Sequence, residues 1–238
     1  MAGELVAFKT RFEVVPLTMV GEKQFTPALG SAKLTPFYDL AIGGLTREKT
    51  WRGALVRYVD PQAKDRILDV GCGTGSLVTQ LKSVTPECQI VGLDPDPDVL
   101  GRAQLKAERL NQSVDWREGF LTDELAAELS PMTKVVSSLV FHQTPIAEKK
   151  NILGSIWRVL EPGGRLYVAD YGHQRTSLMR MLFRWTVQAI DGVEDTTPNA
   201  EGRLPGYMTE IGFDDVQEQQ VIPTATGSIS IYLARKPG

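Results

Sequence analysis

Residues 67–75 read ILDVGCGTG and are followed by SLVTQLKSV over residues 76–84. The first four residues are apolar except for Asp69. Three glycines at alternate positions come next, and from Leu77 the apolar residues recur at helical spacing. An apolar run that passes through glycines into a helical pattern predicts a strand, a tight turn and a helix. Corners of this kind bind nucleotides in doubly wound sheets, so residues 67–84 are the first candidate for a ligand site.

Short apolar runs and longer helical patterns keep alternating after this corner. The turn Glu-Pro-Gly-Gly at 161–164 leads into the last run of the series. Strands alternating with helices are typical of a parallel sheet covered by helices on both faces. We predict strands at 66–70, 89–94, 114–119, 134–140 and 165–170, and helices from 76, at 96–110, within 121–130 and at 146–160.

The two ends of the chain depart from this alternation. Residues 213–221 and 227–235 read as strands joined by a short connection that contains Pro223, and no helix separates them. At least one pairing there is therefore expected to be antiparallel. Residues 1–45 lie outside the alternation and are rich in Pro and Gly, so we interpret them as an arm or lid. Within them, residues 12–20 fit only an edge strand because of Pro16.

Composition limits the class of protein. The 238 residues, 42% of them hydrophobic, are enough for one good-sized core, and the net charge of −3 gives no general attraction to nucleic acid or to anionic membranes. Cys72 and Cys88 are too few for a disulfide framework. The first residues lack the pattern of a signal peptide, and no apolar run is long enough to span a bilayer. We expect a cytoplasmic protein with neither nucleic acid nor membrane as a partner.

Two acids select the ligand of the glycine corner. Asp94 ends the second strand, where a carboxylate accepts hydrogen bonds from ribose hydroxyls. Dinucleotide corners end in Gly or Ala where this chain has Ser76, and Asp69 would repel a pyrophosphate. The same carboxylate suits an ammonium or sulfonium group. S-adenosylmethionine carries both of these groups, and it has a ribose and no phosphate.

The sequence resembles class I S-adenosylmethionine-dependent methyltransferases in several places. Residues 69–75 with Asp94 resemble motif I and the acid that follows it. Across residues 37–238 the likeness is greatest to the small-molecule branch around the ubiquinone/menaquinone C-methyltransferases. It implies an α/β Rossmann-like, doubly wound, seven-stranded mixed sheet with an antiparallel last strand, as a domain over 46–238 behind an N-terminal lid over 1–45. The further matching stretches are VSSLVFHQ (136–143), LEPGGRLYVAD (160–170), LPGYMTEIGFDDV (204–216), and FYD (37–39) followed by Trp51-Arg52, which resembles the lid of that branch.

The resemblance also implies roles for individual residues. Asp69 and the turn backbone hold the methionyl end of S-adenosylmethionine, Asp94 takes the ribose, and Pro95 lies near the adenine. Many relatives carry an acid after the third strand, where this chain has Phe120, so we expect packing by Phe120 to replace that contact. No metal site is expected. The cofactor-binding residues predicted are Asp69, Gly71, Cys72, Gly73, Thr74, Gly75, Asp94, Pro95, Phe120, Leu121 and Ser138.

The acceptor side is less defined by the sequence. His142 follows the fourth strand and either bonds the cofactor or backbone, or transfers a proton. His173 follows the fifth strand as a surface-loop residue, a substrate contact or a base. The helical pattern at 176–190 fits core burial or a lid over an apolar pocket, with Arg180 and Arg184 solvated. Residues 191–206 read as a long acidic loop, at the place where the family has substrate-specificity elements.

These observations predict in-line transfer of a methyl group from S-adenosylmethionine to an O, N or C atom of a small organic acceptor. Three alternatives stay open: a different use of the same cofactor, a cofactor-binding module without catalysis, and a nicotinamide-dependent oxidoreductase. A nucleic-acid methyltransferase is disfavoured because no Asn-Pro-Pro-Tyr-type tetrapeptide follows the fourth strand and no basic patch is evident.

Overall fold

The computed structural model of the protein describes residues 46–238. The predicted lid over residues 1–45, the edge strand proposed at 12–20 and the FYD stretch lie outside these residues. They remain predictions. All elements below belong to the described part of the chain.

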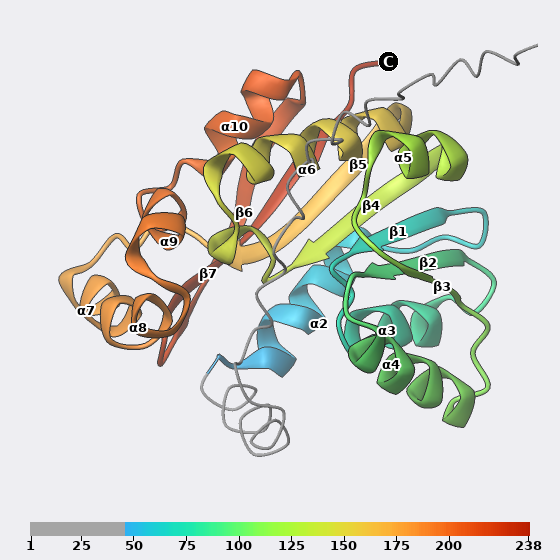
Figure 1. Cartoon of the computed structure of the whole chain (residues 1–238), viewed down its shortest axis with the longest axis horizontal. Coiled ribbons are helices and arrows are strands. Elements are labelled where there is room, and N and C mark those ends of the chain that lie inside the picture. Colours follow the sequence, from blue (N-terminus) through green and yellow to red (C-terminus); the bar gives the residue numbers. More distant parts are fainter. Residues whose placement is uncertain (1–45) are drawn as a thin grey trace, which may run out of the picture. The chain divides into compact units, whose positions relative to one another are not determined.

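The described residues form one seven-stranded mixed sheet in the order β3-β2-β1-β4-β5-β7-β6 (Figure 1). Strands β1 to β5 pair in parallel, and β7 runs antiparallel between β5 and β6. This confirms the predicted fold class. The strands are β1 (Arg66–Val70), β2 (Gln89–Asp94), β3 (Asp115–Glu118), β4 (Met132–Ser138), β5 (Leu160–Tyr171), β6 (Asp214–Thr224) and β7 (Gly227–Arg235).

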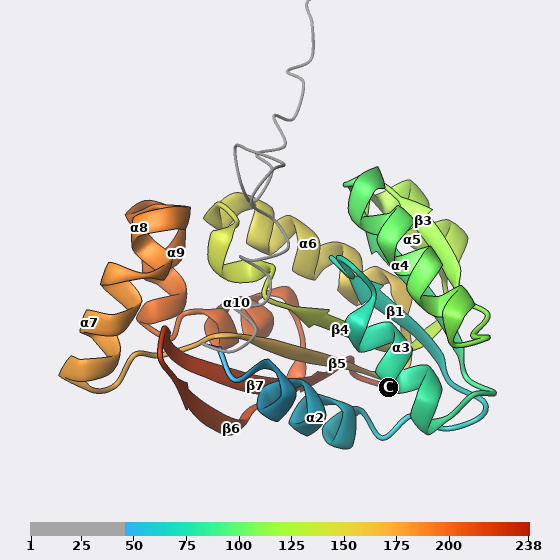
Figure 2. The same cartoon turned by 90° about the horizontal axis from the view of Figure 1, so that it is seen from below.

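Helices cover both faces of this sheet, with α2 on one side of the central strands and α6 on the other (Figure 2). The buried residues accordingly form two apolar clusters, one with α2, α3 and α4 and the other with α5, α6 and α10. The helices are α2 (Glu48–Val59), α3 (Ser76–Val84), α4 (Pro97–Arg109), α5 (Asp123–Leu129), the 3-10 turn η1 (Phe141–Gln143), α6 (Ile146–Val159), α7 (Ser177–Trp185), α8 (Val187–Asp191), α9 (Val193–Ala200) and α10 (Leu204–Ile211).

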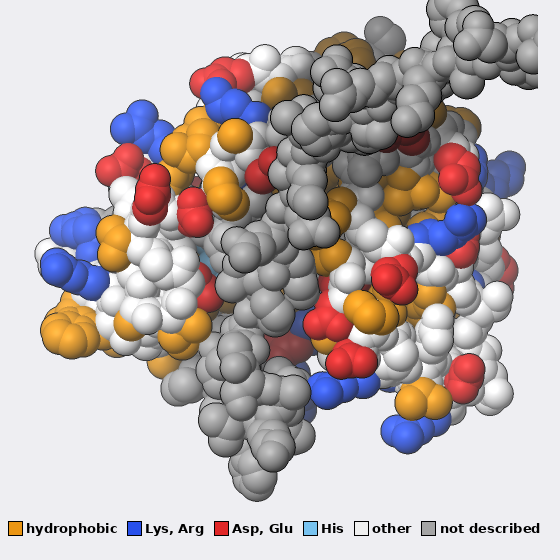
Figure 3. Space-filling model, in the orientation of Figure 1, with side chains coloured by type: hydrophobic (Ala, Val, Ile, Leu, Met, Phe, Trp, Pro, Cys, Tyr) orange, Lys and Arg blue, Asp and Glu red, His pale blue; other side chains and the backbone are white. Residues whose placement is uncertain are grey.

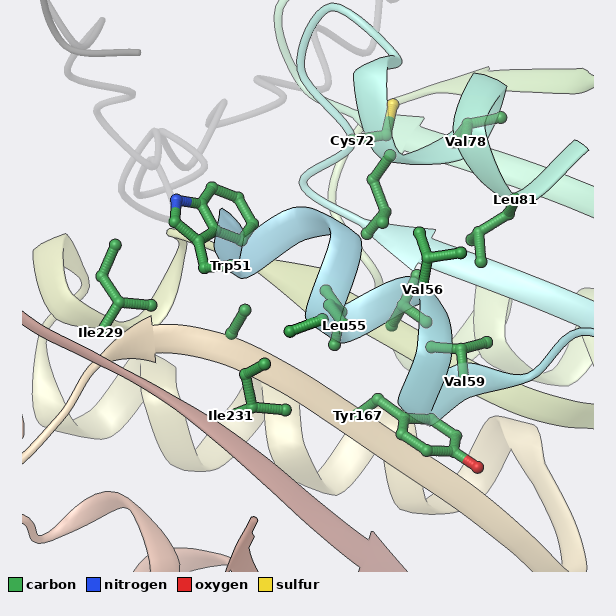
Figure 4. Packing of buried hydrophobic residues seen from close by; sticks show 14 of the residues in the cluster. Trp51, Leu55, Val56, Val59, Cys72, Val78, Leu81, Tyr167, Ile229 and Ile231 are labelled. Carbon is green, nitrogen blue, oxygen red and sulfur yellow. The ribbon is translucent and has the colours of Figure 1, made fainter. Parts of the chain in front are cut away.

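Helix α2 packs its apolar side onto the sheet. Trp51, Leu55 and Val59 are fully buried, and they lie in one cluster with Tyr167 of β5 and Ile231 of β7 (Figure 4). Burying a large apolar side chain contributes about 1.5–3 kcal/mol. Helix α2, residues 48–59, is therefore held firmly against β5 and β7.

Three predicted boundaries were wrong. Pro223 lies inside β6, opposite Ser228 of β7, and not in a connection. This is possible because β6 is an edge strand, where proline's missing N–H costs no ladder bond. The helix predicted at 176–190 breaks at Thr186, whose hydroxyl bonds the Leu182 carbonyl. Residues 193–200, predicted as loop, form α9 despite Pro198.

Candidate functional site

The turn between β1 and α3 places three glycines in the left-handed region, with φ of 74° at Gly71, 52° at Gly73 and 69° at Gly75. A Cβ at Gly71 would lie 2.3 Å from Val140 Cγ2, and one at Gly75 would lie 2.7 Å from Trp116 Cη2. At Gly73 no described atom comes within 4 Å of that position. The outer glycines thus allow close packing, while the middle one faces open space.

Asp94 ties the end of β2 to this turn. Its carboxylate accepts the backbone N–H of Gly73 at 2.8 Å and that of Asp96 at 3.0 Å. Burial raises the pKa of Asp94, although these two N–H groups oppose the rise. The structure therefore brings the predicted ribose-binding acid directly beside the glycine turn.

Asp69 is fully buried at the carboxyl end of β1, between Gly92 of β2 and Val136 of β4. Neither carboxylate oxygen has a hydrogen-bond partner among the described residues. Burial raises the pKa of Asp69 to about 7, the charge of Arg52 opposes this rise and that of Asp94 adds to it. A buried carboxylate without donors is costly, so this one fits a positively charged group supplied by a ligand.

Arg52 of α2 is a site residue for which the sequence suggested only a place in a lid. Its guanidinium pairs with Glu48 one turn earlier and stacks 4.9 Å from the ring centroid of Trp51. Its Nε is buried without a partner in the described part of the chain. Because Arg52 lowers the pKa of Asp69, the two side chains belong to one electrostatic site. The Glu48–Arg52 spacing of four residues is typical of a helical ion pair, but it gives no signal for the electrostatic effect of Arg52 on Asp69.

The residues predicted to face the adenine follow β2 and β3. The backbone N–H of Gly119 bonds the carbonyl of Asp94 at 3.0 Å, which holds the ends of these strands together. The two residues that follow Gly119 differ in exposure: Phe120 is 45% exposed and Leu121 is buried. Pro95, which follows β2, is half-buried. Phe120 therefore follows the link between β2 and β3 directly in sequence, with its side chain partly open to solvent.

The other predicted residues of the turn are already engaged. Lys106 of α4 donates to the hydroxyls of Thr74 (3.3 Å) and Ser76 (2.7 Å). Cys72 is buried and, because of that burial, the pKa of its thiol is raised. Thr74 and Cys72 thus shape the turn, which leaves its backbone as the part best suited to hold a ligand.

His142 lies between two carboxylates at the same edge of the sheet. Its Nδ1 is 2.8 Å from Oδ1 of Asp170 at the end of β5, and its Nε2 is 3.4 Å from Oδ2 of Asp191 at the end of α8. Burial alone lowers the pKa of His142, but the two carboxylates outweigh it and raise the pKa to about 9. The imidazole is therefore protonated at neutral pH, and this favours the structural role over that of a base.

Asp170 organises the turn that carries His142. Its carboxylate also accepts the backbone N–H groups of Phe141 at 2.6 Å and Tyr171 at 2.7 Å. Ser138, the last residue of β4, is half-buried and lies opposite Ala169 in the parallel pairing of β4 with β5. His142 and Ser138 therefore lie at the edge that carries Asp69 and Asp94. His173 is exposed and is not joined to this group by any described contact.

Helices α8 and α9 are fastened to this edge by contacts that the sequence did not predict. Besides Asp191, Asn199 donates to the carbonyl of Tyr171 at 3.0 Å. Lys149 of α6 is fully buried and donates to the backbone carbonyls of Thr144 and, at 2.8 Å, Asp195. Burial lowers the pKa of Lys149 to about 8. The segment expected to be an acidic loop thus contains helix α9, which is anchored to this edge of the sheet.

Among residues 46–238, no group of three or more His, Cys, Asp or Glu side chains is placed to hold a metal ion. No helix in this part of the chain is long and apolar enough to cross a bilayer.

Comparisons with known proteins agree with this geometry. A family model described as a methyltransferase domain matches residues 67–164. The chain is 30% identical over 161 residues to the demethylmenaquinone methyltransferase of Thermus thermophilus, covering 67% of this chain and 72% of that protein. It is 33% identical over 135 residues to the ubiquinone/menaquinone biosynthesis C-methyltransferase UbiE of Dinoroseobacter shibae, covering 56% and 52%.

The match to the demethylmenaquinone methyltransferase of Deinococcus radiodurans, at 30% identity, covers 66% of that relative. The chain thus spans between about half and three quarters of the curated relatives compared here. Among solved structures, the magnesium protoporphyrin IX methyltransferase of Synechocystis with bound S-adenosylhomocysteine has a TM-score of 0.64 at 17% identity, covering 91% of this chain and 90% of that one. At this identity the structural likeness shows the fold alone.

Proposed function

Because this chain belongs to the class I S-adenosylmethionine-dependent methyltransferases, we propose that it binds S-adenosylmethionine at the β1 corner and methylates a small organic acceptor. One observation carries the proposal: the buried carboxylate of Asp69 has no donor among the described residues and lies behind the glycine turn held by Asp94. A ligand that brings an ammonium or sulfonium group and a ribose satisfies both acids.

The residues fit this cofactor from end to end. Asp69 and the backbone of residues 71–75 hold the methionyl end, and Asp94 takes the ribose hydroxyls with the oxygen lone pairs that the turn leaves open. Phe120, with Pro95 and Leu121, packs on the adenine, and Ser138 borders the site from β4. When bound, the cofactor supplies a methyl group on a sulfonium, which is a good leaving group.

The protein's own part is alignment and exclusion of water, effects that lower a barrier by several kcal/mol. We propose that His142, which lies between Asp170 and Asp191, fixes α8 over the acceptor side and does not serve as the proton acceptor. We propose that the acceptor lies between the cofactor and the cover formed by α8 and α9. In the same proposal, residues 1–45 serve as a lid.

The acceptor is proposed from the relatives. Their names specify demethylmenaquinone and 2-phytyl-1,4-naphtoquinone, and the second name describes a fused-ring quinone with a long apolar chain. We propose an aromatic acceptor of this lipophilic kind and leave the methylated atom open. The buried free thiols of Cys72 and Cys88 support a reducing compartment, which for this protein we propose is the cytoplasm.

The cofactor is tested first by calorimetric titration of the whole chain with S-adenosylhomocysteine and, separately, with NAD. One-to-one binding of S-adenosylhomocysteine and no binding of NAD is expected. Binding of NAD would instead support the alternative of a nicotinamide-dependent oxidoreductase. Methyl transfer is then tested with S-adenosylmethionine that carries a labelled methyl group and a panel of aromatic acceptors. If the cofactor binds but no acceptor is methylated, the result would favour a cofactor-binding module without catalysis.

A further inference from the structure

The segment 175–190 is positively charged, although the whole chain has a net negative charge. The full sequence has a net charge of −3, yet these sixteen residues contain Arg175, Arg180 and Arg184 and neither Asp nor Glu. Arg175 pairs with Glu218, but Arg180 and Arg184 have no carboxylate partner among the described residues. Arg180 instead donates to the backbone carbonyls of Gln174 and Arg175. Two positive charges therefore stay uncompensated on α7.

Beside these arginines, α7 and α8 expose large apolar side chains. Leu178, Met181 and Trp185 are 55%, 50% and 77% exposed, and Ile190 of α8 is 53% exposed. The first three recur at spacings of three and four residues, so they form one stripe along α7. Phe183 supplies the opposite, buried side of the same helix. Helix α7 is thus apolar on two sides, and only one of them packs on the protein.

The stripe and the arginines lie together on the outside of the described part. A shallow hollow between α7 and α8 is lined by Arg180, Met181, Arg184, Trp185 and Ala189. In Figure 1 α7 occupies the end opposite α3 and α4, and Figure 3 shows hydrophobic and basic side chains next to one another there. Scattered apolar residues need no explanation, whereas a contiguous apolar stripe flanked by cations marks an interaction surface.

We propose that α7 and α8 dock on an anionic lipid surface. A helix with arginines beside an exposed stripe of Leu, Met and Trp lies in the plane of a bilayer interface, with its apolar side among the acyl chains and its cations at the headgroups. Tryptophan beside arginine suits the headgroup level of a bilayer, where an amphipathic ring and a cation both find their preferred surroundings. The charge pattern selects acidic headgroups.

This docking goes beyond the proposed function and does not depend on it. It revises the expectation, drawn from the net charge, that no membrane is a partner. It needs no spanning helix, and residues 46–238 contain none. The docked segment is continuous with the site, because Asp191 at the end of α8 contacts His142. A lipid surface held there would lie next to the cover of the acceptor side.

The experiment uses the whole chain with vesicles of phosphatidylcholine alone or mixed with phosphatidylglycerol. Sedimentation measures binding, and tryptophan emission reports the environment of Trp185, the most exposed of the four tryptophans described. We expect binding to the anionic vesicles only, with a blue shift of the emission. Arg184→Gln should weaken binding about fivefold, the effect of one cation near an anionic surface, and added salt should do the same.

Trp185→Ser should weaken binding tenfold or more and abolish the blue shift. Leu105→Ser is the matched control, because Leu105 is 53% exposed on α4, away from this surface. Each variant is first shown to melt as the wild type does. The proposal fails if wild-type protein ignores anionic vesicles, or if Leu105→Ser weakens binding as much as Trp185→Ser. It also fails if Trp185→Ser changes self-association without vesicles and leaves vesicle binding intact.

Discussion

The carboxylate of Asp94 accepts the backbone N–H of Gly73 at 2.8 Å, so the last residue of β2 fixes the turn that follows β1. One side chain therefore serves two purposes in the proposed site. It holds the glycine turn in its left-handed conformation, and its remaining lone pairs are available to a ribose. Binding and local stability are consequently coupled at this position.

Replacing Asp94 by Ala should reduce affinity for S-adenosylhomocysteine by a hundredfold or more, because two charge-assisted ribose contacts are lost. The same change should destabilise the fold by about 2 kcal/mol, since the N–H groups of Gly73 and Asp96 lose their acceptor. Calorimetry and urea unfolding measure the two effects. Asp94→Asn keeps one acceptor oxygen, so its affinity and its unfolding free energy should lie between those of the wild type and Asp94→Ala. Unchanged affinity in Asp94→Ala would remove this residue from the site.

Replacing Asp69 by Asn should stabilise the protein in the absence of ligand while weakening its binding of S-adenosylhomocysteine. The folded-state pKa of Asp69 is raised from 3.8 to about 7, so its charge costs stability as pH rises through this range. By linkage the cost above pH 7 is at most about 4 kcal/mol. Urea unfolding at pH 8 without ligand measures the gain.

The matched control for that change is Asp65→Asn. Asp65 pairs with Lys134 at 2.6 Å, and hydrogen bonds from Lys134, Gln62 and Thr133 outweigh burial and lower its pKa. Its replacement should destabilise the protein at pH 8. If both variants lose stability, the carboxylate of Asp69 is not the strained group that its surroundings indicate.

Stability should decline in alkali because of His142. Its pKa rises from 6.5 to about 9 on folding, so its contribution is complete below pH 6.5 and is lost as pH rises through 9. The loss is about 3 kcal/mol by linkage. Lys149 acts in the opposite direction, because its pKa is lowered from 10.5 to about 8 and the protein regains stability as pH rises between these values.

Unfolding free energies of wild type and His142→Gln, measured from pH 6 to pH 10, separate the two residues. The difference between the two proteins should shrink as pH rises, because only the wild type loses the ion pairs with Asp170 and Asp191. His173→Gln is the control at an exposed histidine and should follow the wild-type curve. A constant difference between wild type and His142→Gln across this range would show that His142 does not carry the charge.

Replacing Gly92 by Ala should destabilise the protein by about 1–3 kcal/mol. A Cβ there would lie 2.4 Å from Trp116 Cζ3 and 3.2 Å from Cys72 Sγ, inside a packed core. Adding Trp116→Leu should recover part of the loss. Gly101→Ala in α4 meets no described atom within 4 Å and should instead stabilise the helix by about 0.5–1 kcal/mol. Thermal melting of the four proteins is the measurement.

Much of the sheet and half of the site were predictable from local pattern. Periodicity located the five parallel strands, and an acid at each of two strand ends located Asp69 and Asp94. The carboxyl ends of parallel strands share one edge, so sequence position alone implied their proximity. The place of Pro223 inside β6 was not predictable in the same way. A proline is compatible with a strand mainly at the edge of a sheet, and the sequence does not show which strand forms the edge.

The acceptor side depended on contacts between distant residues. His142 and Asp191 are far apart in the sequence, and neither residue type indicates a partner. Lys149 is fully buried in α6, and its ammonium donates to the backbone carbonyls of Thr144 and Asp195. Backbone partners leave no trace in residue identity. The exposed stripe on α7 was obscured for another reason: apolar residues on two sides of a helix resemble ordinary core until one side is seen uncovered.

The position of β7 sets a condition on how the protein matures. This strand is the last of the seven in the sequence, yet it lies between β5 and β6 and is the only described neighbour of β6. While the chain emerges from the ribosome, β5 therefore keeps one open edge and β6 has no pairing partner until residues 227–235 follow. Unpaired edges of this kind are exposed to aggregation and recruit chaperones. Any delay before residues 227–235 leave the ribosome therefore prolongs that exposure.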